Sequence, residues 1–261
     1  STETLRRQVQ QVARERDIVS LSDARRLLAG EVKRSGSAAS RDVFAITFDD
    51  GYASDFACAL SVLSSMRIPA TVFVPTGYIG TERRLPHDRL YAALCECFRH
   101  DRQIAELELP EPSRSALGAC LAHGPAATLD RLISTQPHDT IVALADALER
   151  RLGLSERDLP EESLLMNWDE IKAVSAAGID VGGHTVEHVA LANVSAERAR
   201  HEITTCRADI QRHLGTAPRH FAYPNGLYTP AVRRAVAEAG FEAAVTTEDL
   251  ENRRGGDPFT L

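Results

Sequence analysis

Residues 44–55 read FAITFDDGYASD, and this stretch joins a run of strand-forming side chains to two adjacent acids and a glycine. The residues from Phe44 to Phe48 favour a buried β-strand. Asp49 and Asp50 follow directly, and Gly51 comes next. A pair of carboxylates beside a buried strand has to be solvated, paired or bound to a cation. The stretch therefore predicts either a solvent-facing strand end or a binding site.

Composition limits the classes of protein to which the chain can belong. Its 261 residues, 43% hydrophobic and 26% charged, suffice for one large domain over residues 1–261. The net charge is -7 and the basic residues form no long stripe, so we expect no nucleic-acid partner. No apolar run approaches the roughly 18 residues of a membrane helix, and the N-terminal residues lack the apolar core of a signal peptide.

The chain has five cysteines, an odd number in a protein too large to depend on disulfide bonds. This slightly favours a reducing, cytoplasmic compartment. Cys95 and Cys97 form a C-x-C pair inside a helical pattern, where residues two apart do not face each other. We expect ordinary thiols there rather than a metal clip.

Short apolar runs alternate with amphipathic helical patterns along most of the chain. Strands are expected at 18–21, 43–48, 70–74, 179–183, 220–224 and 241–247. The helix after the first strand is expected to begin at Ser22 as its N-cap. Residues 82–165 interrupt the alternation and are mostly helical. We expect an α/β fold, a distorted (β/α) barrel of about seven parallel strands, with residues 82–165 as a helical insertion.

Three polar segments follow three of these strands. Asp49 and Asp50 follow the strand at 43–48, His184 follows the strand at 179–183, and Asn225 follows the strand at 220–224. In parallel α/β folds the active site gathers at the carboxyl ends of the strands. We therefore expect these side chains on one rim.

The segment GGHTVEH places His184 and His188 four residues apart. This spacing predicts both imidazoles on one face of a helical turn, close enough to share one ion. Asp50, at a neighbouring strand end, is the expected third ligand. Two neutral imidazoles and one carboxylate leave coordination positions open, as in catalytic sites. Such a set suits Zn²⁺, and Co²⁺ or Ni²⁺ would fit the same ligands.

Three motifs carry a family resemblance: TFDDG at 47–51, HTVEH at 184–188 and FAYPNG at 221–226. In order and spacing they resemble the signature motifs of the polysaccharide deacetylases, the NodB homology domain of carbohydrate esterase family 4. The FAYP form resembles one branch of that family. The resemblance spans about residues 18–247, apart from the insertion. It implies a distorted barrel that holds a divalent ion through Asp50, His184 and His188.

The resemblance also implies a reaction, the hydrolytic removal of acetyl groups from N-acetylated sugars of a polysaccharide or other glycan. Asp49 would be the catalytic base, and the backbone N–H of Asn225 would stabilise the oxyanion. Tyr223 and Pro224, from the same motif, are expected to contact the acylated glycan. Trp168 either lines the sugar site or belongs to the core.

The sequence departs from the family pattern at two functional positions. The usual C-terminal L-x-H, whose histidine protonates the leaving amine, has no match. His87, in LPHDRLY, is the candidate to test for that role, although a surface or substrate-contacting role is favoured for it. Ala222 stands where relatives often carry an arginine that pairs with the base.

Parts of the sequence are also compatible with two other functions. HTVEH matches the H-x-x-E-H pattern of zinc proteases, with Glu187 as base and Glu202 or Glu238 as third ligand. That motif needs a continuous helix, whereas Gly182 and Gly183 end a strand just before it, and it leaves TFDDG and FAYPNG unexplained. The other alternative is a carbohydrate-binding protein without turnover, suggested by the missing acid and arginine. The retained base and ligands argue against it.

Overall fold

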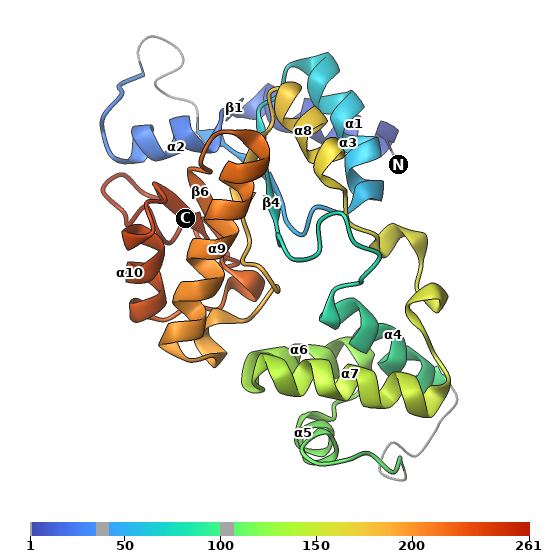
Figure 1. Ribbon diagram of the computed structural model, residues 1–261. Coiled ribbons are helices and arrows are strands. Elements are labelled where there is room, and N and C mark those ends of the chain that lie inside the picture. The colour runs from blue at the N-terminus through green and yellow to red at the C-terminus, as the bar shows by residue number, and fades with distance from the viewer. Residues whose placement is uncertain (1, 35–41, 100–106) are drawn as a thin grey trace.

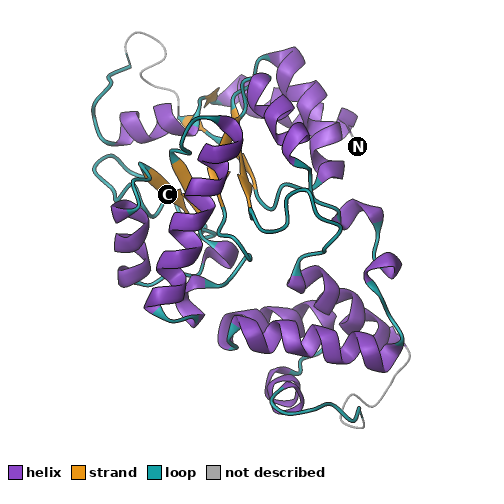
Figure 2. Ribbon diagram, viewed as in Figure 1, coloured by secondary structure: helices purple, strands orange, loops and turns teal. Residues whose placement is uncertain are grey.

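The computed structural model describes residues 2–34, 42–99 and 107–261 (Figures 1 and 2). Its centre is a five-stranded parallel sheet with the order β3-β4-β5-β6-β7. The strands are β3 (Ile46–Phe48), β4 (Ala70–Val74), β5 (Asp180–Gly183), β6 (His220–Ala222) and β7 (Ala243–Val245). Because all five are parallel, their carboxyl ends share one rim. The α/β prediction is confirmed, with the sheet as an open arc that ends at β3 and β7.

The first two strands, β1 (Asp17–Ile18) and β2 (Val43–Phe44), form a separate parallel pair. The segment 43–48 was predicted as one strand, and this is wrong, because it is broken at Ala45. Its first half pairs with β1, where Val19 N donates to Phe44 O at 2.9 Å, and its second half pairs with β4. The described residues thus contain the expected seven strands, divided five and two.

Helices pack around the sheet and bury the residues between them. They are α1 (Thr2–Glu15), α2 (Leu21–Leu28), α3 (Ala53–Met66), α8 (Trp168–Ala176), α9 (Ala196–Leu214) and α10 (Pro230–Glu238). In α9 the apolar face is formed by Ile203, Cys206 and Ile210, all fully buried. Ser20, not Ser22, is the N-cap of α2, since its side chain accepts from Asp23 N. Ser22 faces inward and lies 3.1 Å from His220 Nε2.

The predicted insertion is helical and forms its own bundle below the sheet in Figure 1. It contains α4 (Pro86–Arg99), α5 (Ser113–Cys120), α6 (Pro125–Thr135), α7 (His138–Leu152), and the 3₁₀ turns η3 (Glu156–Asp158) and η4 (Glu161–Ser163). Its core is a separate cluster that includes Leu90, Leu94, Leu132, Leu144 and Leu148, each fully buried. Cys97 lies in this core as an ordinary buried thiol.

The insertion is attached to the sheet portion at two places. On one side its two connecting segments run next to each other, with Gly80 N donating to Met166 O at 3.1 Å and Arg84 Nε to Ser163 Oγ at 2.9 Å. On the other side Asn193, in the 3₁₀ turn η5 (Leu191–Asn193), donates from Nδ2 to Ile133 O at 3.0 Å. The rim of the sheet lies between these attachments. None of the described helices has the length and apolar character needed to cross a bilayer.

Candidate metal centre

Three predicted ligands converge at the carboxyl ends of β3 and β5. His188 Nε2 lies 3.1 Å from Asp50 Oδ1, and His184 Nε2 lies 3.5 Å from the same oxygen. The three ligand atoms are all within 4.8 Å of one another. The two imidazoles are almost fully buried. The spatial convergence expected for Asp50, His184 and His188 is therefore present.

The donor set fits a small divalent ion. His184 Nδ1 lies 2.9 Å from Ala222 O, and because a carbonyl only accepts, Nδ1 carries the proton and the lone pair of Nε2 faces Asp50. Asp50 Oδ1 is buried and, within the described residues, has no hydrogen-bond partner. Ligand atoms bound at about 2.0–2.2 Å in a tetrahedral site lie roughly 3–4 Å apart, as the two distances to Asp50 do here. Asp50, His184 and His188 are thus suited to hold Zn²⁺ or a similar ion.

The loop 184–188 is not helical, so the predicted helical turn is wrong. Thr185 and His188 have φ angles of 66° and 51°, in the left-handed region. The loop is shaped from outside by Glu202 of α9, a buried carboxylate that accepts from Val186 N and Glu187 N at 2.9 Å each. The imidazoles therefore meet through an irregular loop, with ring centroids 4.8 Å apart.

Left-handed backbone recurs around the centre. Asp50 has φ 67° and Asn225 has φ 57°, in addition to the two residues of the 184–188 loop. Each such residue costs on the order of 1–3 kcal/mol and persists where the surrounding structure fixes it. At Gly51, with φ 73°, an added Cβ would lie 3.0 Å from Val74 Cγ1. Glycine is needed there because the turn after β3 is both left-handed and tightly packed.

The two aspartates of the motif have different environments. Burial alone would raise the pKa of Asp50, but the neighbouring imidazoles of His188 and His184 outweigh burial, so the pKa of Asp50 is held well below the usual range. The pKa of Asp49 is raised by desolvation, with His184 opposing and Asp50 adding to the effect. Asp49 also keeps contact with solvent. Asp50 is thus held as an anion next to the two imidazoles, and Asp49 lies beside it.

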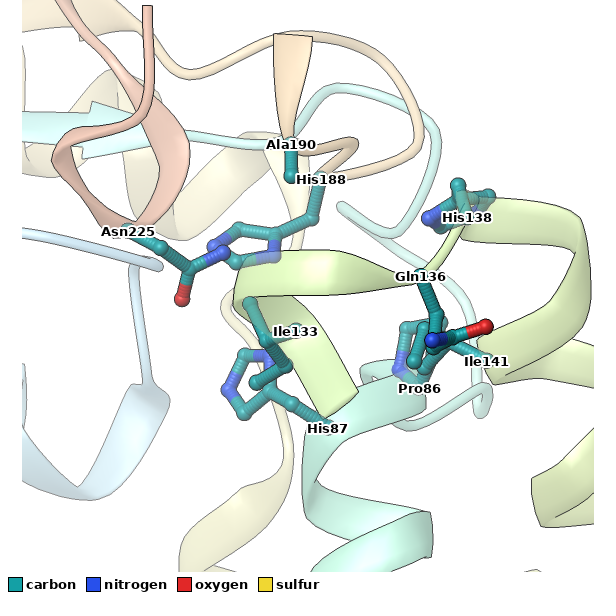
Figure 3. Close-up of a pocket in the computed structure, with 9 residues that line it drawn as sticks. All are labelled: Pro86, His87, Ile133, Gln136, His138, Ile141, His188, Ala190 and Asn225. Carbon is teal, nitrogen blue, oxygen red and sulfur yellow. The ribbon is translucent and has the colours of Figure 1, made fainter. Parts of the chain in front are cut away.

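A small, partly open pocket lies beside the ligands (Figure 3). The sheet portion contributes His188, Ala190 and Asn225 to its lining. The helical insertion contributes Pro86, His87, Ile133, Gln136, His138 and Ile141. Gln136, His138 and their neighbours were not identified from the sequence, because the insertion carries no motif that marks them. Asn225, whose backbone N–H is the predicted oxyanion donor, also lines the pocket.

His87 lies next to the predicted ligands. Its Nε2 is 4.0 Å from Asp50 Oδ2, and its ring centroid is 4.7 Å from that of His188. The Tyr52 hydroxyl donates to Asp88 Oδ2 at 3.0 Å, so its oxygen accepts from His87 Nε2 at 3.2 Å. Burial and the charge of His188 lower the pKa of His87. The sequence did not identify Tyr52 as a pocket residue, although Tyr52 directly follows the DDG motif.

The remaining predicted glycan-contacting residues lie elsewhere. Tyr223 is 1% exposed, and its hydroxyl donates to Phe259 O at 3.1 Å, so its side chain belongs to the core. Pro224 is buried in the 3₁₀ turn that also contains Asn225. Trp168 is half-buried against the core and stacks on His213, with ring centroids 3.9 Å apart. None of the three lines the pocket in Figure 3.

The protease alternative lacks its structural requirement. HTVEH forms a loop, and Glu187 pairs with Arg83 Nη2 at 3.2 Å. Glu202, offered as a third ligand, is engaged with the backbone of the loop. The zinc protease motif depends on a helix that presents both histidines from successive turns, and residues 184–188 do not form one.

Comparison with known proteins gives a consistent result. A sequence profile of the family described as polysaccharide deacetylase matches residues 36–111 and 126–244. A search of curated proteins found no match.

Several solved structures share the fold. IcaB from Ammonifex degensii has a TM-score of 0.63 at 20% identity, covering 100% of this chain and 82% of that one. The deacetylase domain of BpsB from Bordetella bronchiseptica has a TM-score of 0.61 at 15% identity, covering 97% and 80%. The deacetylase PplD of Streptococcus pyogenes, solved in complex with acetate, has a TM-score of 0.56 at 16% identity, covering 94% and 72%.

Proposed function

This chain belongs to the polysaccharide deacetylase family, and from that premise we propose that it is a divalent-metal-dependent hydrolase of N-acetylated sugars. The observation that carries the proposal is the convergence of Asp50, His184 and His188 with a second carboxylate, Asp49, beside them. PplD, a similar structure, was solved with acetate, the acid that such a reaction releases. Zn²⁺ is the ion we expect, and Co²⁺ or Ni²⁺ would suit the same ligands.

A divalent ion held there supplies Lewis-acid chemistry, lowering the pKa of a water molecule and polarising the acetyl carbonyl. Asp49 accepts a proton from the water as its oxygen forms a bond to the carbonyl carbon. The carbonyl oxygen becomes an oxyanion, to which the backbone N–H of Asn225 donates. The C–N bond then breaks, giving acetate and a sugar amine.

The leaving nitrogen has to gain the proton that Asp49 took from the water, and we assign its transfer to His87. It is a pocket imidazole that the ion does not need as a ligand, and Tyr52 orients it through the 3.2 Å contact at Nε2. Replacing His87 with Ala should lower kcat while the protein keeps its metal, and added imidazole should restore part of the rate.

The test is acetate release from N-acetylated and O-acetylated oligosaccharides after chelation and after re-addition of Zn²⁺, Co²⁺ or Ni²⁺. We expect activity to be lost on chelation and regained with metal. Asp50→Asn should lose both bound metal and activity, whereas Glu238→Gln, an exposed carboxylate on α10, should keep both. Acetate release that persists without metal would refute the proposed function. Sugar binding without acetate from any substrate would identify a binding protein.

A further inference from the structure

A hydrogen-bonded chain of three side chains crosses from the sheet portion to the insertion beside the metal centre. Tyr52, which directly follows the DDG turn, donates from its hydroxyl to Asp88 Oδ2 at 3.0 Å. The same hydroxyl oxygen lies 3.2 Å from Nε2 of His87, which lines the pocket in Figure 3. His87 and Asp88 belong to the first turn of α4, so the chain joins the rim of the sheet to the first helix of the insertion.

Tyr52 is held in place by its backbone and by its ring. It forms an isolated antiparallel bridge with Leu165, and the next residue, Ala53, donates from N to Leu164 O at 2.9 Å. Its ring packs against the apolar core that surrounds the sheet. Because the backbone and ring are fixed, the direction of the hydroxyl proton is the feature that still has to be set.

Asp88 sets that direction. An ionised carboxylate accepts hydrogen bonds and cannot donate them, so the Tyr52 hydroxyl donates to Asp88 and its oxygen accepts from His87 Nε2–H. The direct contact does not replace this bond, because Asp88 Oδ1 lies 3.7 Å from His87 Nε2, beyond hydrogen-bond distance. Without Asp88 the hydroxyl could rotate and donate to the imidazole, which would require the other tautomer of His87.

The tautomer decides which ring nitrogen of His87 is free to meet the substrate. Nε2 is held by Tyr52, whereas Nδ1 is buried and, among the described residues, has no hydrogen-bond partner. The proton given to the leaving nitrogen therefore passes through Nδ1, and Nε2 keeps its own proton.

A purely structural role for Asp88 would be the stabilisation of a helix N-terminus by an acid in the first turn. Asp169 occupies such a position in α8, where its side chain is 90% exposed. The side chain of Asp88 is only 23% exposed and is hydrogen-bonded to a residue of the sheet portion. Helix stabilisation requires neither this burial nor this partner.

We propose that Asp88 is a positioning residue, which acts on His87 through the hydroxyl of Tyr52. The inference rests on the proposed function and on the assignment of the proton transfer to His87, and it extends that assignment to the carboxylate behind the tyrosine.

The test is a mutant cycle measured by acetate release from the metal-loaded protein. Tyr52→Phe, which keeps the packed ring, and Asp88→Ala should each lower kcat by about tenfold, while KM and metal content stay unchanged. Because both changes break one chain, the double variant should be within about twofold of the slower single variant. In the His87→Ala background neither change should lower the remaining rate further. Independent effects that multiply would overturn the proposal.

A conservative variant separates orientation from charge. Asp88→Asn keeps an oxygen that can accept from the Tyr52 hydroxyl, so it should retain kcat within about threefold. A loss as large as that of Asp88→Ala would mean that the charge of Asp88 matters and its hydrogen bond to Tyr52 does not, which would contradict the proposal.

Two controls match these variants. Asp169→Ala removes a first-turn carboxylate from α8, and Tyr91→Phe removes a hydroxyl from an exposed position on α4. Neither should change kcat. If Asp88→Ala fails to fold, as judged by thermal unfolding, Tyr52→Phe and Asp88→Asn decide.

Failure of the proposed function would give a different result from failure of this inference. Absence of acetate from every substrate would refute the proposed function, and full activity in His87→Ala would refute the assignment on which the inference depends. Multiplying effects of Tyr52→Phe and Asp88→Ala in an active protein would overturn the role of Asp88 alone.

Discussion

The sheet portion and the helical insertion contribute different things to one pocket. The sheet portion supplies all three predicted ligands, two of them on left-handed backbone at strand ends. The insertion supplies most of the pocket wall from helices with a separate apolar core. The parallel sheet therefore fixes the positions of the candidate ligands, which have to be held to within a few tenths of an ångström. The wall of the pocket comes mostly from the insertion, whose helices pack around a core of their own.

The largest expected effect separates the two aspartates of the sheet rim. Asp49→Asn should lower kcat by about 10²–10⁴-fold, because the water loses its proton acceptor, while metal content stays normal. Asp50→Asn should lose the metal as well. Acetate assays measure kcat, and metal analysis measures the metal content of each variant. If Asp49→Asn also released the metal, the division between ligand and base would be wrong.

The next effect tests the independence of the insertion core. Leu144 is fully buried in α7, so Leu144→Ala should lower the free energy of unfolding of the insertion by about 2–5 kcal/mol. Metal affinity should stay unchanged, because no predicted ligand contacts that core. Hydrogen exchange measures the stability of the insertion, and metal titration measures the metal affinity. Ala127→Gly, on the exposed side of α6, is a milder control in the same bundle. A large loss of metal affinity in Leu144→Ala would show that the two portions are one cooperative unit.

Each portion also contains a buried histidine whose pKa is lowered to about 4, chiefly by burial: His220 in β6 and His138 in α7. Since the unfolded value is near 6.5, the unfolded chain binds more protons between pH 4 and 6.5. Stability from each group is therefore complete above pH 6.5 and is lost as pH falls to about 4, by up to about 3 kcal/mol. His220→Gln and His138→Gln should each flatten the pH dependence of unfolding. An unchanged profile would contradict the burial argument.

The smallest effect concerns the loop that carries the histidines. Glu202→Ala removes the acceptor of two loop N–H groups and should weaken metal binding by about 10–100-fold. Glu197→Ala, an exposed position on the same helix, should have no such effect. Titration with Zn²⁺ measures the difference. Equal affinities in both variants would mean that the loop holds its shape without Glu202.

The convergence of the candidate ligands could be predicted from the sequence because the segments that carry them follow strands. Asp50, His184 and Asn225 each come after an apolar run, and parallel topology places such positions on one rim. The loop shape at 184–188 could not be predicted, since it depends on Glu202 from a later helix. The spacing of His184 and His188 predicts a helical turn, but tertiary contacts give residues 184–188 the shape of an irregular loop.

The wall of the pocket was beyond prediction for a related reason. Gln136 and His138 belong to helices without motifs, and their position depends on contacts such as that between Asn193 and Ile133, sixty residues apart. Tyr223 was expected to meet the glycan because it belongs to a motif, but motif membership does not tell which side chains face the core. The break at Ala45 likewise reflects pairing with two different sheets.

The neighbouring connecting segments have a further consequence. Because the chain leaves the sheet portion near Gly80 and returns at Met166, one hydrogen bond away, the intervening helices occupy a gap that a short turn could close. Length and sequence between those two points can therefore vary without altering strand order or register. Such an arrangement lets the helices that line the pocket change in evolution while the sheet and the carboxylate and imidazole groups at its rim are inherited intact.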